Sequence, residues 1–345
     1  MKIEKITLDA MERCYAAGTL MAGGNRYAVF ASESIDGPCY AYTGDRFEKK
    51  EVIWEKGGGT MSLIQIPGSN GEFIAVQRFF PGFQSAEAKL VWGRRRGNGV
   101  WEIKDLAPLP YVHRFDLFTV EDEIYVLAAA LCGSKKNRED WSDPGKVYTG
   151  KLPPRPEDGM SFTAISENHT RNHGYCRGTW KGSEAGFITS DEGLFVVIPP
   201  KRKGDAWKVD PIIRRPIGDI ALADLDGDGI DELVTIEPFH GDKFMVNKKT
   251  ENGYETIYRY PGEIEFAHAV SGCTLLGKSA VVGGIRRKNC ELFILQYHAE
   301  KGYEARVVEQ GIGPSNVVVV NGNGRDFIIS ANHTQNHAAV YVVTA

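Results

Sequence analysis

A strand–turn–strand pattern recurs seven times along the chain, which predicts an all-β fold, a seven-bladed β-propeller of four-stranded antiparallel blades. The second strands of these repeats are spaced by roughly 40 to 50 residues, an interval typical of propeller blades. The 345 residues include 39 glycines, and short alternating apolar runs replace any long helical pattern. Both features suit one all-β domain, and we expect a single propeller over residues 1–345.

The seven repeats differ in how clearly they show two strands around a turn. They cover residues 19–31, 63–77, 117–129, 186–198, 221–236, 274–284 and 317–330. Their second strands are expected to centre near Val29, Ala75, Tyr125, Phe195, Val234, Val281 and Ile328. The interval between Tyr125 and Phe195 is long, and its Lys, Asp, Gly and Pro content predicts an insertion loop at about 132–160. Residues 2–18 are expected to supply a strand that closes the ring against 337–345.

The fifth repeat contains an acidic turn, DLDGDGIDELV, from Asp224 to Val234. Asp224, Asp226 and Asp228 alternate along this glycine-rich turn, so their carboxylates can converge on one calcium ion. Glu232 stands at the ninth position of the loop. The flanking residues read as strands, and Thr235 occupies the place of the bidentate glutamate of an EF-hand, which argues against that motif. We therefore predict a structural calcium site in the turn between a first and a second strand.

This loop resembles the DxDGDGxxD loop of FG-GAP and VCBS repeats, which are the blades of calcium-bearing β-propellers. The seventh repeat, VVVVNGNGRDFIIS, has the same outline but places Asn321 and Asn323 where the fifth repeat has aspartates. The resemblance implies a propeller with one intact calcium loop.

Composition and charge narrow the class of protein. The formal net charge is −4, no apolar run is long enough to span a bilayer, and no basic-then-apolar signal begins the chain. The six cysteines are dispersed without a CxxC pair, which is typical of reduced thiols in an intracellular protein. Mixed charge without a basic block argues against nucleic acid. We expect a cytoplasmic protein with neither membrane nor nucleic-acid partner, and the oligomeric state stays open.

Most histidines fall in connections that open on one face of a propeller, opposite the acidic turn. Neutral imidazole is a common metal ligand, and residues from different blades can meet only near the central axis. His113, His240, His268 and His333 belong to the third, fifth, sixth and seventh blades. We predict that these four hold a divalent transition metal such as Zn, Mn, Ni or Fe.

A metal held by imidazoles can polarise a carbonyl or carboxylate and acidify the neighbouring C–H bond. A nearby base can then take the proton, as in β-elimination, dehydration or isomerisation of a sugar. We assign this proton-transfer role to His169 or His173 with Tyr175 and Arg114, and expect Asp116 to orient an imidazole. Arginines suit carboxylate or polyhydroxyl groups. The predicted substrate-binding arginines are Arg78, Arg177 and Arg286.

The segment PLPYVHRFDLF, which contains His113, resembles the propeller part of aldos-2-ulose dehydratases, enzymes that dehydrate and isomerise keto-sugars such as anhydrofructose. This resemblance implies a carbon–oxygen lyase acting on a small sugar, without the cupin-like domain of those proteins. Oligogalacturonate lyases, which place a histidine-held metal in a seven-bladed propeller, are a second likeness. A non-enzymatic carbohydrate- or protein-binding propeller is the alternative from a different class.

Overall fold

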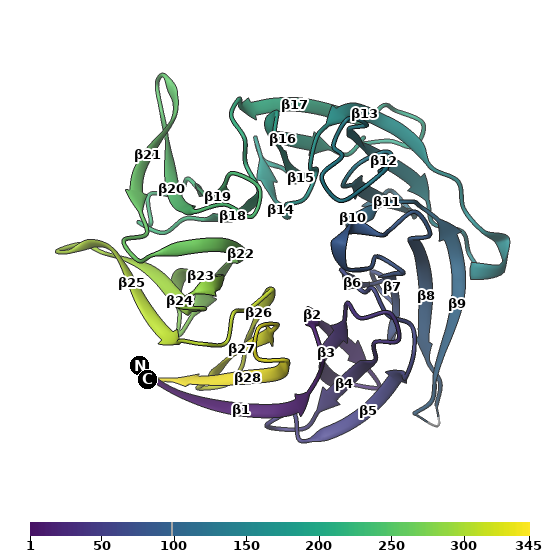
Figure 1. Ribbon diagram of the computed structural model, residues 1–345, viewed down its shortest axis with the longest axis horizontal. Coiled ribbons are helices and arrows are strands. Elements are labelled where there is room, and N and C mark those ends of the chain that lie inside the picture. The colour runs from purple at the N-terminus through teal and green to yellow at the C-terminus, as the bar shows by residue number, and fades with distance from the viewer. Residues whose placement is uncertain (98) are drawn as a thin grey trace. The chain divides into compact units, whose positions relative to one another are not determined.

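The structure, a computed structural model, describes residues 1–97 and 99–345. These residues form seven four-stranded antiparallel sheets, so the predicted seven-bladed β-propeller is confirmed (Figure 1). The chain divides into two compact units, one of Met1–Tyr15 with Arg215–Ala345 (unit 1) and one of Ala16–Arg214 (unit 2). Across the described residues, no helix has the length and apolar character needed to cross a bilayer.

Unit 2 contains blades 1 to 4, whose strands follow one another in chain order within each sheet. Blade 1 comprises β2 (Cys14–Ala22), β3 (Asn25–Ser32), β4 (Cys39–Thr43) and β5 (Lys49–Trp54). The first two residues of β2, Cys14 and Tyr15, belong to unit 1. Blade 2 comprises β6 (Leu63–Gln65), β7 (Glu72–Gln77), β8 (Lys89–Arg95) and β9 (Trp101–Pro108). Blade 3 comprises β10 (Val112–Val120), β11 (Glu123–Ala130), β12 (Gly145–Lys151) and β13 (Thr163–His169). Blade 4 comprises β14 (Tyr175–Trp180), β15 (Ser183–Ser190), β16 (Gly193–Ile198) and β17 (Lys208–Ile213).

Unit 1 contains blades 5 to 7. Blade 5 comprises β18 (Asp219–Ala223), β19 (Glu232–Glu237), β20 (Lys243–Thr250) and β21 (Gly253–Arg259). Blade 6 comprises β22 (Ile264–Leu275), β23 (Lys278–Lys288), β24 (Leu292–His298) and β25 (Gly302–Glu309). Blade 7 comprises β26 (Asn316–Asn321), β27 (Asp326–Asn332), β28 (His337–Thr344) and the N-terminal β1 (Lys2–Ala10). Two short 3-10 turns, η1 (Pro81–Phe83) and η2 (Pro156–Asp158), lie in unit 2.

Blade 7 joins the two ends of the chain. Strand β1 pairs antiparallel with β28 in a register that sets Lys2 opposite Thr344 and Ala10 opposite His337. The expected closure by the N-terminal segment is therefore confirmed. The fourth strand of this blade thus comes from the opposite end of the sequence, so the closing hydrogen bonds hold both termini in one sheet.

The second strand of a blade has an apolar, buried middle because both of its faces are covered. Strand β27 is buried throughout, and every residue of β7 after Glu72 is buried. Fourth strands such as β25, in contrast, are mostly exposed or half-buried. Six of the seven predicted second strands coincide with observed ones, because continuous apolar runs mark these buried positions.

The fourth repeat was assigned one strand too far along the chain. Residues 186–198 form the hairpin of β15 and β16, the second and third strands, so Phe195 lies in a third strand. The true first strand, β14 (YCRGTW), lacks a continuous apolar run and gave no signal. The predicted insertion at 132–160 contains strand β12, which divides that stretch into two loops.

Candidate functional site

His113 and His268 occupy the same kind of position in their blades. Each lies in a first strand, His113 in β10 and His268 in β22, and not just before it as the pattern predicted. The pairing register with the second strand shifts across each histidine, so each sits at a β-bulge. A bulge re-aims the side chain that it carries. Both imidazoles are 2% exposed, so they are available only to groups enclosed with them.

In unit 1, the ring of His268 is held on both sides. Its Nδ1 lies 2.7 Å from the carbonyl oxygen of Ser315, and its Nε2 lies 3.1 Å from the hydroxyl of Tyr15. A carbonyl oxygen only accepts hydrogen bonds, so Nδ1 carries the ring proton and Nε2 has the lone pair. This orientation by a backbone carbonyl is the usual outer contact of a metal-binding histidine.

Tyr15 was missed by the sequence analysis, which used residues 2–18 only for ring closure. It lies in β2, is 3% exposed, and packs edge-on against His268 with ring centroids 5.3 Å apart. Ser315 donates its hydroxyl to the Tyr15 carbonyl at 2.9 Å, and Asn316 donates its amide to the same oxygen at 2.8 Å. No local pattern marks this tyrosine, because its partners are about 250 to 300 residues away in sequence.

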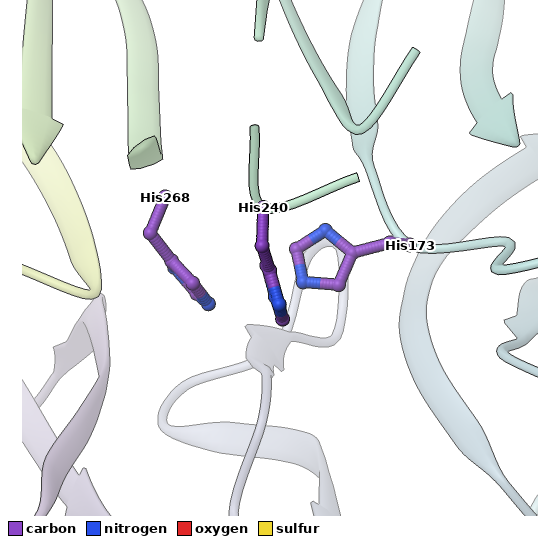
Figure 2. A group of neighbouring side chains, drawn as sticks. All are labelled: His173, His240 and His268. Carbon is purple, nitrogen blue, oxygen red and sulfur yellow. The ribbon is translucent and has the colours of Figure 1, made fainter. Parts of the chain in front are cut away.

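His240 lies in the connection between β19 and β20, as predicted, and is clamped between two phenylalanines. Its ring stacks on Phe239 at 3.9 Å and on Phe266 at 4.1 Å between centroids. The ring of His268 lies 5.1 Å away at an interplanar angle of 25°, and Figure 2 shows the two imidazoles with their planes nearly parallel. Unit 1 therefore presents two imidazoles in fixed orientations, one from a bulged strand and one from a loop.

His333 lies in the connection between β27 and β28, but its ring contacts a cation. The guanidinium of Arg286 lies 2.8 Å from its Nδ1 and 3.0 Å from its Nε2. A guanidinium group only donates and is permanently positive, so Arg286 competes for the lone pair of a His333 nitrogen and also repels a metal cation, unlike the neutral hydroxyl beside His268. This contact disfavours His333 as a ligand, and it assigns Arg286 a partner within the protein.

Unit 2 contains a second histidine pair. His173 lies in the connection between β13 and β14, and its ring centroid is 4.3 Å from that of His113. The Nδ1 of His113 lies 3.2 Å from the carbonyl oxygen of His173. By the argument used for His268, the Nε2 of His113 keeps its lone pair. His173 is 2% exposed, so both rings are enclosed.

His169, a predicted base, is the last residue of β13 and makes a different contact. Its Nε2 lies 2.7 Å from the hydroxyl of Ser166, and its ring meets Phe195 edge-on at 4.8 Å. Burial lowers the pKa of this imidazole, so the ring is neutral near pH 7. Its Nδ1 has no hydrogen-bond partner among the residues described. These contacts favour a packed, neutral histidine.

Tyr175 and Arg177 share one carboxylate. Tyr175 donates its hydroxyl to Asp116 at 2.5 Å, and the Nε of Arg177 donates to the same oxygen at 2.8 Å. Burial, and then the negative charge of Asp116, raise the pKa of Tyr175 well above its usual value. The carboxylate also accepts the backbone N–H of Leu117. Asp116 therefore orients a tyrosine and an arginine, and not an imidazole as predicted, because β14 presents these two side chains to β10.

The two remaining predicted arginines also have partners inside unit 2. Arg114 donates to the carbonyl oxygen of Met61 at 3.1 Å, which ties blade 3 to blade 2. Arg78 pairs with Glu87 at the surface. The contacts that the structure gives these arginines are structural ones.

The acidic loop connects β18 to β19, the predicted first-to-second turn. Carboxylate oxygens of Asp224, Asp226 and Glu232 lie within 4.8 Å of one another. The ammonium of Lys248 contacts Asp226, lies 2.8 Å from Asp228, and lies 3.5 Å from Glu232. These contacts raise the pKa of Lys248, and Lys248 lowers the pKa of Asp228. The donor set fits calcium, but an ion must displace this ammonium to use all four carboxylates.

Comparisons with known proteins concern the fold. No protein family matches the chain, and no curated protein does. Among solved structures, the chain is similar to Sqt1 of Saccharomyces cerevisiae, with a TM-score of 0.59 and 10% identity over all of both chains. It is also similar to the soluble aldose sugar dehydrogenase of Escherichia coli in its apo form, with a TM-score of 0.51 and 11% identity over all of both chains. These likenesses support a propeller, and the FG-GAP, VCBS and dehydratase resemblances stay predictions.

Proposed function

We propose that this protein is a metal-dependent carbohydrate lyase or dehydratase, with His240 and His268 of unit 1 as ligands of a divalent transition metal (Figure 2). The observation that carries the proposal is the hydrogen bond from His268 to Ser315, which leaves a lone pair on Nε2 in a ring parallel to that of His240. Neutral imidazoles suit Zn, Mn, Ni or Fe. When bound, such an ion supplies Lewis-acid activation of a carbonyl or carboxylate.

Tyr15 is the group that we propose for proton transfer. Its hydroxyl lies 3.1 Å from His268 Nε2, beside the proposed ligands. As a tyrosinate, formed when its hydroxyl proton has passed to solvent, it would take the proton α to the carbonyl, while the C–H electrons form the new double bond and the β C–O bond breaks. Tyr15 then holds the abstracted proton and can return it to the departing oxygen. The departing oxygen leaves as water or an alcohol once it receives a proton. This replaces His169 and Tyr175, whose polar contacts are to Ser166 and Asp116.

Arg286 is suited to the negative charge that develops on the substrate oxygen. His333 and the Phe266 ring hold its guanidinium, which lies 4.9 Å from that ring centroid. A guanidinium has five N–H donors, so contact with one imidazole leaves others for an enolate or carboxylate. We propose Arg286 as the substrate-binding arginine of unit 1.

Metal analysis and an elimination assay test this function together. We expect about one equivalent of a first-row transition metal or zinc per chain, lost in His240→Ala and His268→Ala and kept in His298→Ala. His298 ends β24 and lies near Glu304, so its variant is the matched control. Ultraviolet absorbance should report unsaturated products from anhydrofructose for a dehydratase, or from oligogalacturonate for a uronide lyase. Sugar binding without turnover and without a transition metal would instead establish a non-enzymatic carbohydrate-binding propeller.

The cellular compartment of the protein is also a proposal. All six cysteines, Cys14, Cys39, Cys132, Cys176, Cys273 and Cys290, have free thiols. Free thiols are typical of proteins in a reducing compartment, and this supports a cytoplasmic location. Calcium in the acidic loop remains a proposal that rests on the donor set of Asp224, Asp226, Asp228 and Glu232.

A further inference from the structure

A cavity of about 510 Å³ in unit 2 has neither His113 nor His173 among its lining residues. It is formed by the connection between β7 and β8, by the connection between β11 and β12, and by Tyr111 just before β10. This volume falls within the range of small-molecule sites. The cavity has three kinds of lining group: aromatic rings, cations and one buried hydroxyl.

The aromatic rings come from Phe80, Phe83 and Tyr111. Phe83 and Tyr111 have positive φ angles of 63° and 58°. Residues other than glycine rarely adopt this conformation, and where they do, the surrounding structure imposes it. Two of the three rings are thus held at the cavity by strained backbone, which a merely apolar surface loop does not need.

Three cationic side chains line the cavity: Lys135 is held by a neighbouring aromatic ring, and Lys136 and Arg138 are exposed. The ammonium of Lys135 lies 3.4 Å from the centroid of the Trp141 ring, and Phe83 meets the same ring edge-on at 5.2 Å. These contacts brace the loop between β11 and β12. Lys136 and Arg138 also line the cavity and are exposed, and neither has an ion-pair partner among the described residues. The single acidic lining residue, Glu87, is already paired with Arg78.

The floor contains an unsatisfied hydroxyl. Ser85 lines the cavity with 0% exposure, and its Oγ makes no hydrogen bond with any described residue. A buried polar atom without a partner is unfavourable. A ligand hydroxyl or a bound water would satisfy it.

We propose that this cavity binds an anionic sugar, with its acidic group on Lys136 and Arg138, its ring face against Phe83 and a hydroxyl near Ser85. Cations pair with a carboxylate or phosphate, an aromatic ring packs on the apolar face of a pyranose, and a lone hydroxyl suits a polyol. All these residues belong to unit 2, so the inference does not depend on the proposed metal site.

Isothermal titration with trigalacturonate, glucose 6-phosphate, neutral galactose oligomers and inorganic phosphate tests the inference, with EDTA present to exclude the metal site. We expect at least one of the two acidic sugars to bind, with affinity that falls as salt rises, and the neutral sugar and phosphate to bind at least tenfold more weakly. Lys136→Ala with Arg138→Ala should weaken binding about tenfold or more, and Phe83→Ala should weaken it without changing its salt dependence. The pair Lys243→Ala with Lys249→Ala on β20 removes the same charge elsewhere and should leave affinity unchanged.

Equal affinity for the neutral and acidic sugars would overturn the proposal, and so would equal affinity for inorganic phosphate. Unchanged binding in the Lys136 and Arg138 variant would do the same. Thermal melts of each variant identify any that fail to fold, and Lys136→Gln with Arg138→Gln then gives the same test with smaller changes in shape.

Discussion

The Nδ1 of His268 lies 2.7 Å from the carbonyl oxygen of Ser315, and His113 makes the corresponding contact with the carbonyl oxygen of His173 at 3.2 Å. Each histidine sits at a bulge of a first strand, and each donates from the same ring nitrogen to backbone outside its own blade. In both blades, a β-bulge and a backbone carbonyl oxygen orient the imidazole so that the lone pair is on Nε2.

The two roles of the His268 ring can be separated by substitution. Asn carries an amide nitrogen at the same number of bonds from Cα as Nδ1, so His268→Asn can keep the hydrogen bond to Ser315 while removing Nε2. We expect both His268→Asn and His268→Ala to lose the transition metal. In urea unfolding of the metal-free proteins, the alanine variant should be less stable by about 1 kcal/mol or more, because Ser315 then loses a donor. Metal retention in His268→Asn would count against Nε2 as the ligand.

Tyr15→Phe tests the proton-transfer role. We expect kcat to fall by about 10²–10⁴-fold, the range of general acid–base catalysis, with the metal content unchanged. Tyr42→Phe, another buried tyrosine, is the control and should keep full activity. An active Tyr15→Phe enzyme would assign the proton transfer to another residue.

Lys248 and calcium are expected to compete for the acidic loop. Lys248→Met removes the ammonium from between Asp226 and Asp228, so the free carboxylates repel one another. We expect a lower Tm than wild type in EDTA and a larger rise in Tm on addition of calcium. Lys249→Met, at the neighbouring exposed lysine, should behave like wild type. Equal calcium responses in all three proteins would show that the loop binds no calcium at this site.

His169 should make the protein sensitive to mild acid. Its pKa is lowered by burial, so the unfolded chain takes up a proton near pH 6.5 while the folded chain does not. The contribution of the neutral His169 ring to stability is therefore present above about pH 6.5 and is lost as pH falls toward the pKa of the folded state. Between pH 8 and pH 5, the urea midpoint of unfolding should fall less in His169→Gln than in wild type. The same fall in both would mean that His169 is protonated in the folded protein.

Tyr175 should make the stability of the protein depend on pH in the alkaline range. Its pKa is raised by burial and by Asp116, so the contribution to stability is present below about pH 10 and is lost as pH rises through the folded pKa. Tyr175→Phe should be less stable than wild type at pH 7 by about 1.5–3 kcal/mol, since a charge-assisted hydrogen bond is lost. Above pH 10 the difference should shrink. A constant difference between pH 7 and 11 would contradict the assignment.

The local pattern of the chain was enough to determine the blades. Second strands such as β27 are covered on both faces, so each contains a short apolar run, and turn residues separate them from their neighbours. The acidic turn between β18 and β19 and the loop positions of His240 and His333 follow from the same order of strands. Where the first strand lacked this signal, in β14, the prediction moved by one strand.

Only the tertiary structure decided what the side chains do. The lone pair of His268 depends on Ser315, 47 residues away, and Tyr15 meets this imidazole across 253 residues of sequence. Arg286 contacts the ring nitrogens of His333, and the ammonium of Lys248 contacts the acidic loop. Neither contact could be predicted from the neighbouring residues in the sequence. The pattern of apolar residues along a strand shows which positions are buried, because burial selects the residue type at each position. Hydrogen bonds join single atoms from distant segments, and their partners are set only when those segments pack together.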